Sequence, residues 1–250
     1  GVNTHELVRE LQSHGIKILG STIIGMEDHT PENINQVIDY ADRHDTDFHQ
    51  FMLYTPIEGT PLHAEMLEQG RLKPRSESHP ADAHGQFKFN YHHSHIHGGL
   101  ETEMLARAFR HDLEVNGPSI VRVARTMLAG WKRHREHPDQ RIRRRFAREV
   151  RELATTHAPI VWAARRYYRR SPELHAKMSQ LLREIYNQLG WTARIAGTLG
   201  GPYVFWKIRQ EERRLASGWK YEPPTFYEKN SVAAAMNSSA PSIKSPPRYI

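Results

Sequence analysis

The stretch IKILGSTIIG (residues 16–25) has the pattern of a buried β-strand. Its apolar residues follow one another with little alternation, which is typical of a strand covered on both faces, as in a parallel sheet. The stretch DFHQFML (47–53) predicts a second strand. Between them, residues 29–44 predict a helix with Thr30 as N-cap and Pro31 at the first helical position. Strands joined by a helix indicate a crossover connection and parallel pairing.

Helices are also predicted on either side of this strand–helix–strand unit. Residues 4–15 carry an apolar stripe and begin at Thr4, a plausible N-cap. The pair Thr60-Pro61 predicts the start of a short helix that ends near Gly70. Two strands cannot bury a sheet on their own, so we expect this α/β segment to be the end of a larger α/β body.

The rest of the chain predicts an all-α region. We divide the sequence into an α/β part (1–72), an irregular connector (73–100), a helical domain (101–218) and a tail (219–250). The tail is rich in Ser, Ala and Pro, which predicts disorder. The expected fold class is therefore α/β followed by all-α.

Composition excludes several classes of protein. The chain has 250 residues, of which 38% are hydrophobic, and no apolar run approaches the ~18–20 residues that span a bilayer. No secretory signal is visible, so a cytoplasmic location is the default expectation. The chain contains no cysteine, which excludes disulfides, cysteine nucleophiles and iron–sulfur ligands within these residues.

The charge is strongly basic. The formal net charge is +7 and the pI is about 9.7, with much of the excess in residues 132–151 and 165–170. A basic face attracts nucleic acid, other phosphates or anionic lipid. The same pattern is also typical of solvated helix faces, because glutamates are interleaved with the arginines.

A histidine-rich stretch, FNYHHSHIHGG (89–99), allows two interpretations. On a strand, His93, His95 and His97 would point the same way and could bind zinc, copper or iron. No further ligand is fixed nearby by the sequence. We therefore favour a polar loop and assign no metal ligand.

The candidate ligand site lies in the loops that follow the two predicted strands. In α/β sheets and barrels, ligands bind at the carboxyl ends of the strands. Residues 25–30 and 54–60 occupy that position, and we expect Ile24 and Leu53 to lie on neighbouring strands that open onto a shared cavity. Gly25 allows close approach of a ligand to the backbone. The alternative is a pair of well-made turns that bind nothing.

Two longer stretches carry a resemblance to a known family. GIKILGSTIIGMEDHTPENI, followed by DFHQFMLYTPIEGTPLHAEMLEQGRL, resembles the last third of the radical S-adenosylmethionine barrel. The similarity covers residues 4–72 and is greatest to the branch with an N-terminal cobalamin-binding domain. It implies a partial (β/α)6 barrel in which a four-iron four-sulfur cluster binds and reductively cleaves S-adenosylmethionine. The product is a 5′-deoxyadenosyl radical that abstracts hydrogen from a substrate.

The resemblance also implies cofactor-binding residues. The family's Gly-x-Ile-x-Gly-x-x-Glu strand motif falls on residues 21–28, where Ser21 and Asp28 depart from it. In relatives this strand lies beside the adenine, and the end of the last strand adds backbone contacts. The implied adenine-side residues are Ile23, Gly25, Asp28, Tyr54, Thr55 and Pro56.

The family's Cys-x-x-x-Cys-x-x-Cys motif is absent from this chain. We expect the chain to be a C-terminal fragment, inactive by itself, whose upstream part carries the cluster and the cobalamin domain. A relative without the cluster is the alternative. Catalytic residues are not assigned, and the expected substrate is a small or lipid-like molecule rather than RNA. A different class of function, binding of nucleic acid or a membrane surface by the basic helices of residues 101–217, is the second hypothesis.

Overall fold

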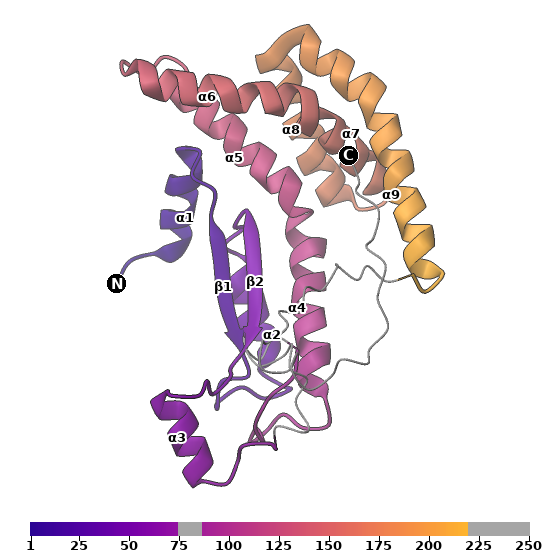
Figure 1. Ribbon diagram of the computed structural model, residues 1–250. Helices are drawn as coiled ribbons and strands as arrows, with labels where there is room; N and C mark the ends of the chain where they lie inside the picture. Colours follow the sequence, from indigo (N-terminus) through magenta and orange to yellow (C-terminus); the bar gives the residue numbers. More distant parts are fainter. Residues whose placement is uncertain (75–86, 220–250) are drawn as a thin grey trace, which may run out of the picture. The chain divides into compact units, whose positions relative to one another are not determined.

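The computed structural model describes residues 1–74 and 87–219, and these are mostly helical (Figure 1). Part of the predicted connector and all but the first residue of the predicted tail lie outside the described residues. The chain divides into two compact units, residues 1–209 and 210–250. Among the described residues, no helix combines the length and the apolar composition needed to cross a membrane.

The first part of the chain alternates helices and strands. Its elements are α1 (Thr4–Ser13), β1 (Leu19–Ile24), α2 (Ile34–Asp42), β2 (Phe48–Leu53) and α3 (Pro61–Glu68). Helices follow from residue 100 onward. They are α4 (Leu100–Asn116), α5 (Ser119–His134), α6 (Gln140–Glu152), α7 (Ala158–Tyr167), α8 (Pro172–Ile195) and α9 (Gly201–Ala216), with π-helical turns η3 (Leu153–His157) and η4 (Ala196–Gly200).

The two strands pair in parallel. Leu19 lies opposite Phe48 and Ile24 lies opposite Leu53, so the strands run in register over their whole length. The prediction that Ile24 and Leu53 belong to neighbouring parallel strands is confirmed, as is the change from α/β to all-α along the chain. The sheet of the described residues contains these two strands, and a barrel is not confirmed.

The helix starts differ from the prediction in two places. Asn3, rather than Thr4, caps α1, since its side chain accepts hydrogen bonds from the backbone N–H groups of the next turn. Helix α2 begins at Ile34, because Thr30 and Asn33 hydrogen-bond each other and close a separate turn before it. The start of α3 is as predicted, with Thr60 as N-cap.

The two faces of the sheet have different surroundings. One face is closed by α2 and α4, and it buries Ile24, Phe51 and Leu53. The opposite face, which we call the open face, carries the alternate residues Leu19, Ser21, Ile23, Phe48, Gln50 and Met52. Leu19 is 60% exposed, Ile23 43% and Phe48 45%. The prediction of a sheet covered on both faces therefore holds for only one face.

Two apolar cores lie within residues 1–209. The first joins the sheet to α2, α3 and α4 and includes the fully buried Tyr91. Helix α4 contributes Met104, Leu105 and Ala108 to this sheet core, although its sequence begins the predicted helical region.

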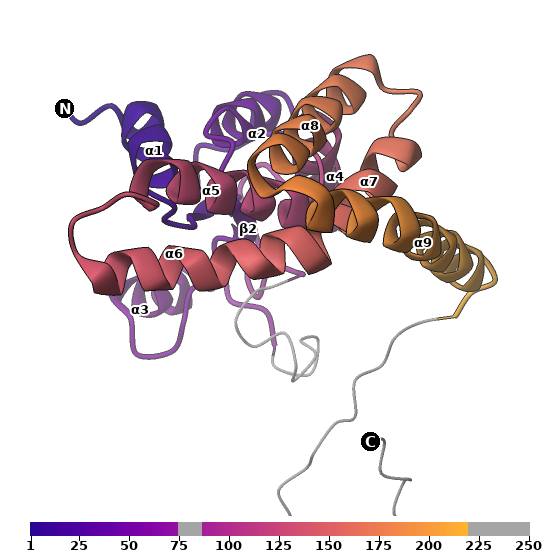
Figure 2. The same cartoon turned by 90° about the horizontal axis from the view of Figure 1, so that it is seen from above.

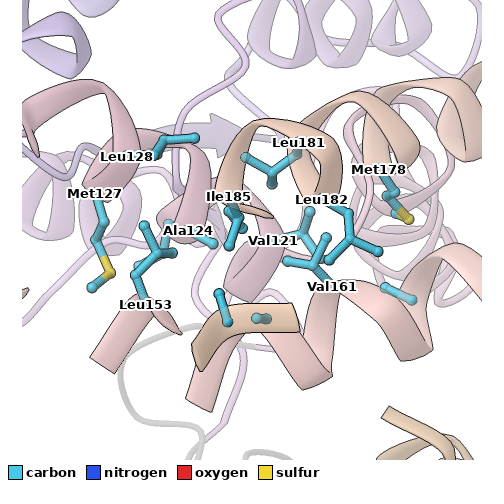
Figure 3. Packing of buried hydrophobic residues seen from close by; sticks show 14 of the residues in the cluster. Val121, Ala124, Met127, Leu128, Leu153, Val161, Met178, Leu181, Leu182 and Ile185 are labelled. Carbon is cyan, nitrogen blue, oxygen red and sulfur yellow. The ribbon is translucent and has the colours of Figure 1, made fainter. Parts of the chain in front are cut away.

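The second core is formed by α5, α7, α8 and the π turn η3 (Figure 3). Its buried side chains include Leu153, Val161 and Ile185. Helix α6 packs beside α5, as the view from above shows (Figure 2), and its buried Phe146 fits against Gly15 and Gly130. Both glycines are needed there, because a Cβ on either would lie less than 3 Å from the Phe146 ring.

Candidate functional site

Three segments meet at the carboxyl ends of the strands. They are the loop 25–30 after β1, the loop 54–60 after β2 and the segment 87–97, and we call them together the carboxyl-end cluster. The first two were predicted from the sequence. The third was expected only as part of an irregular connector.

Gly25 lies at the centre of the cluster. Its backbone has φ +80°, a conformation that favours glycine, and a Cβ at this position would lie 2.3 Å from Phe89 Cζ. Its N–H donates to His29 Nδ1 at 3.0 Å, and its C=O accepts from the Tyr91 hydroxyl at 3.2 Å. The close approach that the sequence predicted at Gly25 is therefore made by Phe89 of the same chain.

His29 and His93 have defined tautomers. His29 Nδ1 accepts from the N–H groups of Gly25 and Met26, so its proton is on Nε2. Burial lowers the pKa of His29 below its ordinary value, which keeps the ring neutral at neutral pH. His93 Nδ1 accepts two backbone N–H groups, from residues 95 and 96, and its Nε2–H donates to Met26 O at 3.1 Å.

The histidine-rich stretch is not a β-strand. The alternative in which His93, His95 and His97 share one side of a strand does not apply, because His93 is buried while the other two are exposed. Both ring nitrogens of His93 are used in hydrogen bonds to the backbone. His93 thus packs against the strand ends, and the stretch forms a loop there.

An ion pair ties the segments together at the surface. Arg71 Nη2 lies 3.1 Å from each carboxylate oxygen of Glu27, and the Ser94 hydroxyl donates to the same carboxylate at 3.1 Å. Arg71 Nε also donates to His92 O. Glu27 belongs to the first loop and Ser94 to the third segment, so this network fixes one against the other.

The second loop continues the sheet before it turns. The Tyr54 N–H donates to Ile24 O at 2.8 Å, and the Thr55 hydroxyl donates to Leu53 O at 3.1 Å. Pro56 is buried, and its C=O accepts from Asn90 Nδ2 at 2.9 Å. The stiff Thr-Pro exit is therefore held by the segment 87–97 as well.

The six residues predicted to contact adenine separate into four environments. Gly25 and Pro56 lie under the segment 87–97, Tyr54 and Thr55 are half-buried at the end of β2, and Ile23 lies on the open face. Asp28 is exposed, and its backbone C=O accepts from Asn33 Nδ2. The shared cavity itself stays a prediction.

The sequence did not predict a buried polar network on the face of the sheet that α2 and α4 close. Asp42 at the end of α2, His49 on β2 and Asp112 on α4 offer ligand atoms that all lie within 4.8 Å of one another. Asp42 Oδ1 is buried and has no hydrogen-bond partner among the described residues, while Asp42 Oδ2 accepts from His111 Nδ1 at 2.6 Å. Burial raises the pKa of Asp42 to about 6.

The contacts of Arg122 indicate that this network stabilises the fold. Its guanidinium donates to both oxygens of Asp112, at 2.7 and 2.6 Å, and it is 2% exposed. Asp112 also accepts from Asn116. A metal ion would have to displace this buried bidentate ion pair. The negative charge of Asp112 is therefore balanced by Arg122. The sequence held one signal of it, since Asp112 falls on the same helical face as Met104, Leu105 and Ala108.

A neighbouring hollow has a basic lining. The cavity of about 500 Å³ beside Asp42 is lined by four cationic side chains, those of Arg9, Arg43, Arg125 and Lys177. Arg125 is already paired with Asp45 at 2.6 Å, and Lys177 donates to Val115 O. This cavity lies at the amino ends of the strands, away from the carboxyl-end cluster.

Comparison with protein-family models, with curated proteins and with solved structures gave no match for this chain. Any assignment of function to this chain therefore rests on its geometry and on the motifs of residues 4–72.

Proposed function

We propose that this chain supplies the last two strand–helix units of a radical S-adenosylmethionine barrel, together with helices on the substrate side. The iron–sulfur cluster would be held by cysteines of an upstream part of the same protein, because this chain has none. The observation that carries the proposal is the parallel pair β1–β2, whose uncovered face bears Ser21 and Ile23 of the motif.

The open face supports a role in cofactor binding. Ser21 and Ile23 alternate along β1, so their side chains share one side of the strand, and that side is opposite to α2 and α4. In a barrel, helices cover the outside of the sheet and the other face looks inward. The residue that matches the family's adenine-side isoleucine, Ile23, is therefore on the side that an enclosing barrel would turn toward its ligand.

The free edge of β1 supports the presence of a further strand. The even-numbered residues of β1 hydrogen-bond to β2, as shown by the bond from Tyr54 N–H to Ile24 O. The backbone groups of Leu19, Ser21 and Ile23 point to the other edge, where the described residues provide no partner. Such an edge pairs readily with another strand, and it carries no charge or proline that would prevent this.

We propose that Ile23, Tyr54 and Thr55 form the part of this chain that would bind the adenine end of S-adenosylmethionine. When bound to a reduced cluster, that molecule supplies the 5′-deoxyadenosyl radical. Ile23 would pack against the base, while backbone groups near Tyr54 and Thr55 would offer hydrogen bonds at the strand end. The segment 87–97 immobilises this rim through Tyr91 and Asn90. Cobalamin, if the full protein binds it, would be held by the upstream domain, and the substrate and the cytoplasmic location stay predictions.

The proposal is tested on the full-length protein. The coding DNA upstream of residue 1 is read, and we expect an in-frame Cys-x-x-x-Cys-x-x-Cys motif. The full protein is then reconstituted with iron and sulfide under anaerobic conditions and given S-adenosylmethionine and a reductant. We expect formation of 5′-deoxyadenosine. An upstream frame without the three cysteines, or a reconstituted protein that leaves S-adenosylmethionine intact, contradicts the proposal.

A matched pair of variants tests the open face separately. Ile23→Ala is expected to raise the KM for S-adenosylmethionine, because the base loses apolar contact. Ile16→Ala is the control, since Ile16 is the same residue type with the same 43% exposure and lies before the strand. Equal kinetic effects of the two substitutions would show that the open face does not bind the cofactor.

A further inference from the structure

A stripe of large apolar side chains runs along the surface of the last helical segment. It consists of Trp191, Ile195, Leu199, Tyr203 and Trp206, which are 73%, 51%, 75%, 61% and 53% exposed. Their spacing of three or four residues places them on one side of a helix. This is the reverse of an ordinary surface helix, whose exposed side is polar.

The opposite side of the same segment is packed against the protein. Its residues are small, namely Ala193, Gly197 and Gly201, and all three are buried. A Cβ at Gly197 would lie 2.2 Å from the Tyr186 hydroxyl, and one at Gly201 would lie 2.5 Å from the Trp162 ring. These close contacts fix the rotation of the segment, so the apolar stripe is held facing outward.

Two backbone features keep the stripe straight. The break at Gly190, with φ 68° and ψ −146°, starts a new helical direction at Trp191. The π turn η4 then lies in the middle of the stripe. A step of four residues along an α-helix rotates about 40° beyond a full turn. The π turn contains more residues per turn, so it reverses this drift by about the rotation of one residue. Leu199 and Tyr203 therefore stay in line with Trp191.

The chemistry around the stripe favours a lipid surface. Arg194 lies between the first two residues of the stripe, and Lys207 and Arg209 follow its last residue. Lys207 Nζ lies 5.0 Å from the centroid of the Trp206 ring. Tryptophan and tyrosine concentrate at the level of lipid headgroups, where basic side chains meet phosphates. The chain as a whole has a formal net charge of +7, so it is attracted to an anionic bilayer.

The area of the stripe does not by itself select its partner. Aromatic side chains present about 150–250 Å² each, so these five partly exposed residues offer roughly 600–700 Å². The choice of a lipid surface rests on composition, because three of the five residues are Trp or Tyr and basic side chains adjoin them.

We propose that residues 191–209 form an interfacial segment that docks this protein on the surface of an anionic lipid bilayer. The aromatic and aliphatic stripe inserts at the level of the headgroups, and the basic residues contact lipid phosphates. The segment lies on the surface and does not span the membrane. This inference stands independently of the radical enzyme proposal, because it needs neither cofactor nor upstream residues.

Vesicle co-sedimentation of the 250-residue protein tests the inference. Vesicles of phosphatidylcholine alone are compared with vesicles that also contain phosphatidylglycerol, at low and high salt. We expect binding to the anionic vesicles that weakens with added salt. Leu199→Ser should lower the partition coefficient roughly tenfold, because a leucine loses its apolar contact with lipid. Leu67→Ser on α3 is the matched control, since Leu67 is 62% exposed outside the stripe, and it should change nothing.

Three results would overturn the inference. The first is the absence of binding to anionic vesicles at low salt. The second is an equal effect of the substitutions at Leu199 and Leu67, which would show non-specific adsorption. The third is a wild-type dimer, measured by analytical ultracentrifugation, that Leu199→Ser converts to a monomer, because the stripe would then be a protein interface.

Discussion

The substitution Asp42→Asn should remove a pH dependence from the stability of the protein. Asp42 is fully buried and one of its oxygens has no partner among the described residues. The causes that act on its pKa are, first, burial, which raises it, and then the hydrogen bond from His111, which lowers it. Asp112 raises this pKa further and Arg122 lowers it. The result is a rise from 3.8 to about 6.

The sign and size of the effect follow from linkage. A carboxyl group whose pKa is higher in the folded state binds its proton more tightly there. Its protonated form favours folding fully below pH 3.8, and this contribution is lost as the pH rises through about 6. At 1.36 kcal/mol for each tenfold change in proton affinity, the loss is about 3 kcal/mol. Asparagine does not titrate, so the variant keeps the same contribution at every pH.

The measurement is urea unfolding of both proteins between pH 4 and pH 7.5. The free energy of unfolding of Asp42→Asn minus that of the wild type should increase by up to about 3 kcal/mol over this range, with the change between pH 4 and 6. Asp39→Asn is the control, since Asp39 is exposed on the same helix and also lies 3.5 Å from His111. A difference that is independent of pH, or that is equal for the two variants, would refute the argument.

Three further predictions concern packing, charge and membrane binding. Gly25→Ala should lower the free energy of unfolding by at least about 2 kcal/mol in urea titrations, because the new Cβ meets Phe89 at a positive φ; a change below about 0.5 kcal/mol would contradict the geometry. Arg122→Met should lower it by about 3–5 kcal/mol, and adding Asp112→Leu should restore much of the loss, since a lone buried carboxylate is the costly species; equal stabilities of the single and double variants would contradict this. Arg194→Gln should lower the partition onto anionic vesicles about fivefold without affecting neutral ones, as judged by co-sedimentation, because one lipid-facing charge is removed.

Part of the fold could be read from the sequence because its signals are local. The apolar runs at 16–25 and 47–53 identify the strands, and the helix between them determines that they pair in parallel. The Thr60-Pro61 start of α3 is likewise fixed by neighbouring atoms. At α1 two adjacent polar residues, Asn3 and Thr4, could serve as N-cap. Asn3 is the cap, because its side chain accepts hydrogen bonds from the N–H groups of residues 5 and 6.

The candidate site could be predicted only in outline, because its closure is non-local. Tyr91 and Asn90 reach loops that lie 34 to 66 residues earlier in the chain, and nothing in their own neighbourhood indicates these partners. The spacing of the histidines allowed a metal site on a β-strand. The backbone there is a loop that packs against the ends of β1 and β2 instead. The buried charge network is similar, since Arg122 satisfies a carboxylate that belongs to the preceding helix.

The way in which Tyr91 and Asn90 hold the rim has a consequence for variation. Both donate to main-chain carbonyls, those of Gly25 and Pro56, and neither bond depends on a loop side chain. The exposed side chain of Ile57 can therefore change identity while the anchor points stay in place, whereas Gly59 has φ +86°, which favours glycine. Under the proposed function, exchange of such exposed rim residues would change selectivity at this end of the protein, provided that Tyr91, Asn90 and Gly25 are kept.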